Sequence, residues 1–182
     1  MKTWSTAVGL LAVVGALHAQ EMPQPGKEHA WLEALQGEWT TETEIVTEPG
    51  QPPMKIKGEA SGRAVGGFWT VVDHRGDLGG MAFHGVLTLG YDAKRKKHVG
   101  TWVDSMNDYL WSYEGALDAE GKVLTLDTKG PNHKDGTITP FQEKITLKGP
   151  DAFTLTSAIE TDGRMTPFLT VTYARKAKTE KR

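Results

Sequence analysis

Cysteine is absent from this chain of 182 residues, and its absence excludes several kinds of chemistry together. Without thiols the protein has no disulfide, no thiol nucleophile, no cysteine-ligated zinc site and no iron–sulfur cluster. A lipid anchor on a processed N-terminal cysteine is excluded for the same reason. The fold therefore depends on its core and its hydrogen bonds for stability.

The sequence also lacks an excess of charge of either sign. The 21 Lys and Arg residues nearly balance 23 Asp and Glu residues, and the formal net charge is −2. Proteins that bind nucleic acid or an anionic membrane surface usually present a concentrated basic face. We therefore expect no nucleic-acid partner, and the modest length predicts one soluble domain.

Long hydrophobic runs are missing as well, apart from a short one at the N-terminus. Residues 7–16 are apolar or glycine, follow the cation Lys2 and precede small residues near Ala19. A membrane-spanning helix needs about 20 apolar residues, whereas this arrangement is typical of a secretory signal. We predict that residues 1–19 are a signal peptide and that the protein is periplasmic or secreted, with no stable membrane insertion.

After the signal, the pattern indicates one short helix followed by strands. Trp31, Leu32 and Leu35 share one side of a helical stretch over residues 28–35. From Trp39 onward, segments of period two alternate with turn residues at intervals of about 8 to 14 residues, which is typical of an antiparallel sandwich or barrel. We expect an all-β fold of about ten strands, with an N-terminal segment over 20–36, the β domain over 37–176 and a disordered charged tail over 177–182.

Turn positions predict which side chains face the interior. A two-residue loop at residues 106–107 sets Trp102 opposite Trp111 and Gly100 opposite Tyr113. A turn near residues 119–121 sets Gly115 opposite Leu124, and a turn at residue 162 sets Leu155 opposite Leu169. The predicted inner face contains Trp102, Trp111, Tyr113, Leu124, Leu126, Phe141, Ile145, Leu147, Phe153, Leu155, Ile159, Leu169 and Val171.

The hairpin over residues 67–91 allows two registers. One register sets Leu87 opposite Trp69 and Phe83 opposite Asp73, so that Asp73 and Arg75 join the inner set. A slip by one residue brings His74 and His84 inward instead, because adjacent side chains in a strand point to opposite faces.

A few polar residues also fall on the inner face. Glu143 and Ser157 follow from the strand parity, and Asp104 lies near a strand end beside Tyr109. An isolated inward charge is costly, so these groups must pair, contact water or bind something polar. Two interpretations stay open: these groups bind a ligand, or they are satisfied without one. The second is possible because strand ends are exposed to water and because a neighbouring strand or buried water can satisfy Glu143.

Other chemistry has little support in the sequence. The five histidines after the predicted signal (His29, His74, His84, His98 and His133) lie at no spacing of a zinc motif, and no Gly-x-Ser-x-Gly occurs. The glycine pairs at 66–67 and 79–80 lack the strand-to-helix context of a phosphate loop. We therefore predict no metal and no cofactor. A carboxylate pair such as Asp104 with Glu143 is the candidate for acid–base work.

Several motifs together resemble the family called domain of unknown function 1579. They are Pro25-Gly26-x-x-His29-x-Trp31-Leu32-x-x-Leu35-x-Gly37-x-Trp39, Leu87-Thr88-Leu89-Gly90-Tyr91-Asp92, Gly100-Thr101-Trp102-Val103-Asp104-Ser105-Met106, Tyr113-Glu114-Gly115 and Leu124-Thr125-Leu126. The resemblance implies a calycin-like, up-and-down antiparallel β-barrel, similar to lipocalins and fatty-acid-binding proteins, over residues 37–176. It implies no settled activity.

Two further likenesses concern single residues. Gly37-x-Trp39 resembles the first-strand motif of lipocalins, in which the tryptophan closes the barrel base under a basic residue of the last strand. Arg175 is the matching basic residue. Haem-binding nitrobindin-like barrels are also similar, but they use an axial histidine near the chain end, and no histidine follows His133.

We therefore expect a barrel that binds a small, largely apolar or amphipathic molecule carrying a polar group. Trp69, Trp102, Trp111 and Tyr113 would form the apolar wall, and Arg75, Asp104 and Tyr109 would orient the polar end. The alternatives are an enzyme of the hydrolase or isomerase type that uses inward carboxylates, and a filled barrel that acts as a structural or interaction module. The oligomeric state stays open.

Overall fold

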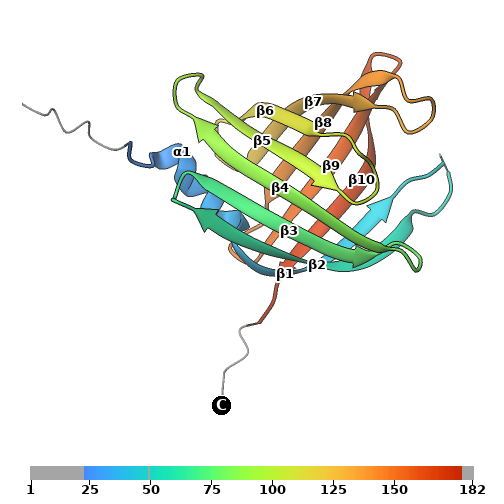
Figure 1. Cartoon of the computed structure of the whole chain (residues 1–182), viewed down its shortest axis with the longest axis horizontal. Helices are drawn as coiled ribbons and strands as arrows, with labels where there is room; N and C mark the ends of the chain where they lie inside the picture. The colour runs from blue at the N-terminus through green and yellow to red at the C-terminus, as the bar shows by residue number, and fades with distance from the viewer. Residues whose placement is uncertain (1–22, 49, 178–182) are drawn as a thin grey trace, which may run out of the picture.

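Each strand of this chain pairs with its sequence neighbour, and the first strand pairs with the last (Figure 1). The computed structural model describes residues 23–48 and 50–177, so the predicted signal peptide and nearly all of the predicted tail lie outside the described residues. Within the described part, ten antiparallel strands close into one barrel, which confirms the predicted fold class. The strands are β1 (Gly37–Ile45), β2 (Met54–Val65), β3 (Trp69–Asp77), β4 (Ala82–Asp92), β5 (Lys97–Asp104), β6 (Trp111–Leu117), β7 (Val123–Pro131), β8 (Ile138–Leu147), β9 (Ala152–Thr161) and β10 (Arg164–Arg175).

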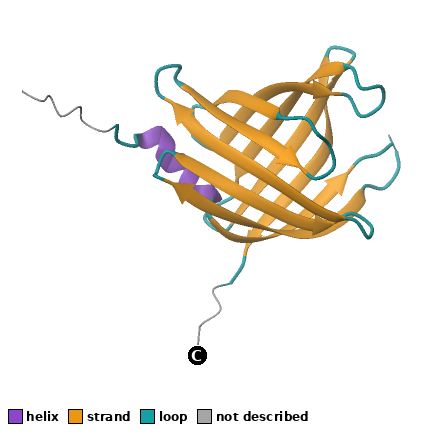
Figure 2. Ribbon diagram, in the orientation of Figure 1, coloured by secondary structure: helices purple, strands orange, loops and turns teal. Residues whose placement is uncertain are grey.

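The predicted helix covers one end of this barrel (Figure 2). It consists of the α-helical turn α1 (Lys27–Ala30) and the 3₁₀ helix η1 (Trp31–Leu35). Leu32 and Leu35 are buried, and the Leu32 carbonyl accepts a hydrogen bond from Thr70 Oγ1 at 3.1 Å. No helix among residues 23–48 and 50–177 is long and apolar enough to cross a membrane.

Arg175 holds the last strand against the first at this closed end. Its guanidinium lies 4.1 Å from the ring centroid of Trp39, and Nη1 donates to the Gln36 carbonyl at 2.9 Å. Nε and Nη2 donate to the Pro150 carbonyl at 3.1 and 2.9 Å. A planar guanidinium can stack on a ring and donate several hydrogen bonds at once. The expected contact between Trp39 and a basic residue of the last strand is therefore confirmed.

The predicted hairpin registers have mixed outcomes. Trp102 lies opposite Trp111 and Gly100 opposite Tyr113, as predicted, although residues 105–110 form a longer loop than the expected two residues. Gly115 lies opposite Leu126 rather than Leu124. That offset is two residues, so the same side chains still face inward.

A β-bulge in β10 determines which side chains of the β9–β10 hairpin face the interior. Thr161 pairs with Arg164 across a two-residue turn, a register that alone would set Leu155 opposite Thr170. The irregularity between Pro167 and Leu169 shifts the register by one residue, so that Leu155 lies opposite Val171. The predicted partner, Leu169, is wrong by two positions, but the predicted face is right.

The first register considered for the β3–β4 hairpin is wrong. Leu87 pairs with Val72, and Trp69 pairs with Gly90, an odd offset that exchanges the two faces of β3. The physical reasons are a four-residue turn at 78–81 and the missing side chain at Gly90, over which the Trp69 ring packs. His74 is therefore buried inside the barrel, whereas Asp73 and Arg75 alternate with it and face outward.

The Arg175 contact generates the first prediction. Replacing Arg175 with Lys removes the stacked plane and at least two hydrogen bonds, so we expect the free energy of unfolding to fall by about 2 kcal/mol. Urea unfolding followed by circular dichroism measures the change. The matched control is Arg63→Lys, at an exposed position on β2, which should change the free energy by less than about 0.5 kcal/mol. Equal stability of the two variants would contradict the role assigned to Arg175.

Candidate functional site

A cavity of about 650 Å³ lies inside the barrel. Side chains or backbone from all ten strands border it, so its shape is set by the closed sheet rather than by one loop. This volume lies within the range of about 300 to 1,000 Å³ that is common for small-molecule sites. The interior is therefore not filled by side chains, unlike the expectation for a purely structural barrel.

Most of the cavity wall is apolar and aromatic. Members of this wall come from β4 to β10 and include Leu87, Trp102, Trp111, Tyr113, Leu126, Phe141, Ile145, Leu155 and Val171. Trp111 packs edge to face on Phe141, with ring centroids 5.0 Å apart. Large aromatic surfaces in a concave site favour an apolar partner.

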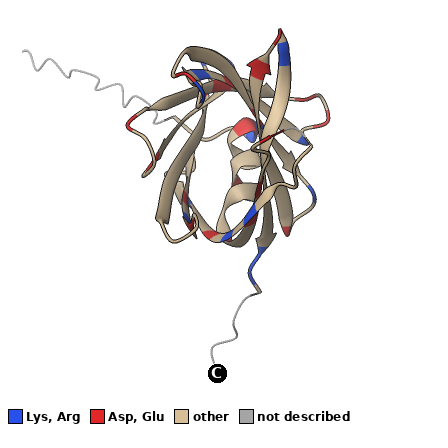
Figure 3. Cartoon of the chain, turned by 90° about the vertical axis from the view of Figure 1, so that its right-hand side faces the viewer, with Lys and Arg blue, Asp and Glu red and all other residues tan. Residues whose placement is uncertain are grey.

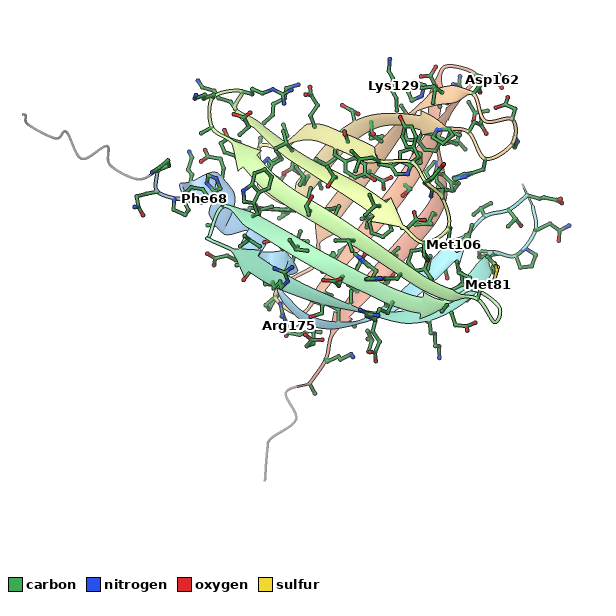
Figure 4. All side chains as sticks on the ribbon, viewed as in Figure 1. Phe68, Met81, Met106, Lys129, Asp162 and Arg175 are labelled. Carbon is green, nitrogen blue, oxygen red and sulfur yellow. The ribbon has the colours of Figure 1, made fainter. Side chains whose placement is uncertain are left out.

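The cavity opens at the end opposite the helix, where apolar side chains lie beside polar and charged ones. Figure 3 views the barrel from this end and shows acidic and basic residues interspersed along it. Met81 and Met106 lie at this end, and Arg175 lies at the other (Figure 4). Exposed apolar side chains on the loops and strand ends of the rim are Val46, Met54, Met81, Met106, Leu110, Ile138 and Met165. Of these, Val46 and Met106 border the cavity itself.

A small group of polar side chains lies within the apolar wall. Glu143 on β8 faces Ser157 on β9, and Ser157 Oγ donates to Glu143 Oε2 at 2.5 Å. His74 Nε2 and the Tyr173 hydroxyl lie 2.8 Å apart. Tyr113, His74, Glu143, Ser157 and Tyr173 all border the cavity, and we call these five residues the interior polar cluster.

Burial determines the charge of this cluster. It raises the pKa of Glu143 from 4.5 to about 7, against the opposing effect of the Ser157 hydrogen bond. Burial also lowers the pKa of His74 to about 4, so this imidazole is neutral at pH 7. The pKa values of Tyr113 and Tyr173 are raised by burial and by the nearby charge of Glu143. The cluster therefore contains one group that titrates near neutral pH.

Asp104 lies at the cavity mouth and organises the β5–β6 loop. Its carboxylate accepts hydrogen bonds from Trp102 Nε1 at 2.7 Å, from the Met106 backbone N–H at 2.8 Å and from Asn107 Nδ2 at 3.0 Å. These donors come from the strand and from the loop that follows it. Asp104 thus fixes both the Trp102 ring and the start of the loop.

The structure brings some of the predicted site residues together and separates others. Trp102, Trp111 and Tyr113 form part of the cavity wall, and Asp104 lies at its mouth. Arg75 borders the open end, but its side chain is exposed and belongs to the outward face of β3.

Trp69 and Tyr109 do not border the cavity. Trp69 is 43% exposed and packs on the outside over Gly90. Tyr109 covers the edge of Trp111 at a centroid distance of 5.2 Å, and its hydroxyl donates to the Lys129 carbonyl at 3.0 Å. The prediction for Trp69 assumed the wrong β3 register. The prediction for Tyr109 assumed that its side chain points into the barrel at a strand end.

Sequence reasoning missed His74 and Tyr173 as site residues. The second register considered for the β3–β4 hairpin placed both His74 and His84 inside, and it is right for His74. His84 is exposed instead, and its Nε2 lies 3.2 Å from Asp73 Oδ1. Tyr173 lies two residues after the inward Val171, so strand parity was the available signal.

Comparison with known proteins identifies the family. The family model described as protein of unknown function (DUF1579) matches residues 24–175. The chain belongs to this family. The resemblance seen in the sequence motifs is therefore confirmed. No curated protein matches the chain.

Solved structures share the barrel of this DUF1579 protein at low sequence identity. The crystal structure of Rv2717c from M. tuberculosis is 13% identical, with a TM-score of 0.62, and the match covers 85% of this chain and all of the other. The S-type phycobiliprotein lyase CPES from Guillardia theta is 14% identical, with a TM-score of 0.56, and the match covers 86% of this chain and all of the other. At this identity the likeness shows a common fold.

The buried carboxyl generates the second prediction. Because folding raises the pKa of Glu143, the folded state binds the proton more tightly, and the unfolding free energy falls as the pH rises from about 4.5 to above 7. Glu143→Gln removes this loss and keeps an acceptor for Ser157. We expect the variant to gain roughly 3 kcal/mol over the unmodified protein at pH 8.5 and almost nothing at pH 4.5.

Urea unfolding of both proteins across this pH range measures the difference. The opposite contribution of His74, which stabilises the protein as pH rises, is common to both proteins and cancels in the comparison. A difference that does not change with pH would contradict the raised pKa of Glu143.

Proposed function

We propose that this protein binds a small, largely apolar molecule that carries one polar group, inside the barrel. The observation that supports the proposal is the cavity of about 650 Å³, whose apolar wall surrounds a buried polar cluster. Burial of apolar surface supplies most of the affinity of such sites, and a few placed polar groups supply orientation. The barrel satisfies both requirements without contributions from a partner chain.

Catalysis by paired carboxylates has less support. The Asp104 carboxylate is occupied by three donors that hold the β5–β6 loop in place. Glu143 lies on the barrel wall with Ser157 as its hydrogen-bond partner. Each carboxylate thus has a structural partner of its own, and the two have no direct contact in the part of the chain that the structure describes.

We also propose that the protein acts after export, because residues 1–19 have the pattern of a secretory signal. When the full gene is expressed in a Gram-negative bacterium, the periplasmic fraction should contain a product that starts at Gln20. Intact mass and N-terminal sequencing measure this. Recovery of the protein in the cytoplasm with Met1 and residues 2–19 attached would contradict export.

A cavity-filling substitution tests ligand binding. Val171 borders the cavity on β10, and its neighbour Thr172 points outward. We expect Val171→Trp to weaken binding of the neutral apolar probe N-phenyl-1-naphthylamine by about tenfold or more, because the indole occupies ligand space. Thr172→Trp adds the same side chain outside the barrel and should leave the affinity unchanged. Probe fluorescence measures both dissociation constants.

Thermal unfolding monitored by circular dichroism serves as the control for folding of both variants. The proposal is contradicted if the unmodified protein does not bind the probe, or if the two tryptophan variants bind it equally well.

A further inference from the structure

The cavity contains a buried acid, Glu143, and none of the described residues that border it is a buried lysine or arginine. Glu143 forms no ion pair within the residues that the structure describes, and its side-chain hydrogen bond is the one from Ser157. The cationic side chains that border the cavity, Lys57, Arg75 and Lys134, are all exposed and lie toward its open end. The interior is therefore arranged to accept a donor or a cation rather than an anion.

We propose that the ligand carries a cationic amine and that Glu143 is its counter-ion inside the barrel. This inference rests on the proposed binding function and names the chemistry of the polar group. The ligand would be an amphipathic amine, with an apolar body against the aromatic wall and an ammonium group beside Glu143.

The contacts of Glu143 leave room for such a partner. A carboxylate has about four acceptor positions, and Ser157 uses one of them. Tyr113 and Tyr173 border the same cavity from β6 and β10, and the charge of Glu143 contributes to the raised pKa of each phenol. An ammonium group has three N–H donors and can satisfy several of these acceptors together.

The aromatic wall favours the same kind of ligand. Trp102, Trp111, Tyr113 and Phe141 border the cavity near the polar cluster. Indole, phenol and phenyl faces attract cations when the site is shielded from water. This observation is independent of the carboxyl group and points to the same sign of charge.

A fatty acid that enters with its carboxylate inward fits this interior poorly. Its carboxylate would lie beside Glu143 with no interior cation to offset the repulsion, so one of the two groups would have to be protonated. An alcohol of the same length avoids the repulsion but lacks the attraction between charges. The expected order of affinity is therefore amine, then alcohol, then carboxylate.

Binding of the amine should depend on pH through Glu143. The groups that face this carboxyl are Ser157 on β9, Tyr113 on β6 and Tyr173 on β10, with His74 on β3 behind Tyr173. The charge of Asp104 on β5 also raises the pKa of Tyr113. The basic side chains that border the mouth are Lys57, Arg75, Lys134 and His133. Since His74 is neutral above pH 5.5 and both phenols keep their protons, Glu143 is the cluster member that ionises between pH 5.5 and 8.5.

Competition experiments with three ligands of equal chain length test the inference. Dodecylamine, dodecanol and dodecanoate compete with N-phenyl-1-naphthylamine for the purified protein at pH 8.5. We expect dodecylamine to bind at least about tenfold more tightly than dodecanoate, and its affinity to rise by about tenfold or more from pH 5.5 to 8.5. Glu143→Gln should reduce both effects to less than about threefold.

The matched control is Asp127→Asn, which removes a carboxylate from the exposed outer face of β7. It should leave the amine preference and its pH dependence unchanged. Thermal unfolding verifies that both variants are folded, and the pH profile of the unmodified protein tests the inference without any variant.

The outcomes separate this inference from the proposed function. Equal or tighter binding of dodecanoate, a flat pH profile, or an unchanged preference in Glu143→Gln would overturn the inference while ligand binding stands. Displacement of the probe by none of the three compounds would also overturn it. Failure of the probe and of all three compounds to bind would contradict the proposed function as well.

Discussion

The contact between Arg175 and Trp39 joins the first and last strands at the closed end of the barrel. By stacking on the ring and donating to backbone carbonyls at residues 36 and 150, the guanidinium joins the first strand, the last strand and the adjoining loops. Trp39 packs edge to face on Phe153, and its Nε1 donates to the Leu35 carbonyl of η1 at 3.2 Å. The closed sheet above this end encloses the cavity of about 650 Å³.

The interior polar cluster has a cost that the rest of the fold does not explain. A buried carboxyl without a cation destabilises the folded state once it ionises. An apolar residue at position 143 would pack against the same neighbours without that penalty. The amine ligand proposed above would offset this charge, since its binding energy would compensate for the desolvation of the carboxyl group. Under that proposal, stability and binding are coupled through one side chain.

Much of the fold could be predicted, because period-two patterns indicate the strands and their faces, and turn residues indicate where each strand ends. In the β6–β7 and β9–β10 hairpins, partner errors of two residues left the predicted faces correct, since side-chain direction repeats every two positions. The β3 face could not be predicted, because its register depends on the length of a glycine-containing turn and on the packing of Trp69 over Gly90. The alternation along β8, β9 and β10 therefore predicts Glu143 and Ser157 inside and was sufficient to find Tyr173, whereas the inward direction of His74 depends on the β3 register.

The titration of Glu143 with and without an amine tests the central claim most directly. Carbon-13 NMR of protein labelled in the glutamate carboxyl groups, with Glu143→Gln to assign the resonance, follows this group alone. In the free protein the pKa should be about 7, and saturation with dodecylamine should lower it by at least about one pH unit because the ammonium favours the charged form. A carboxyl that titrates identically in the free and the saturated protein would contradict the account.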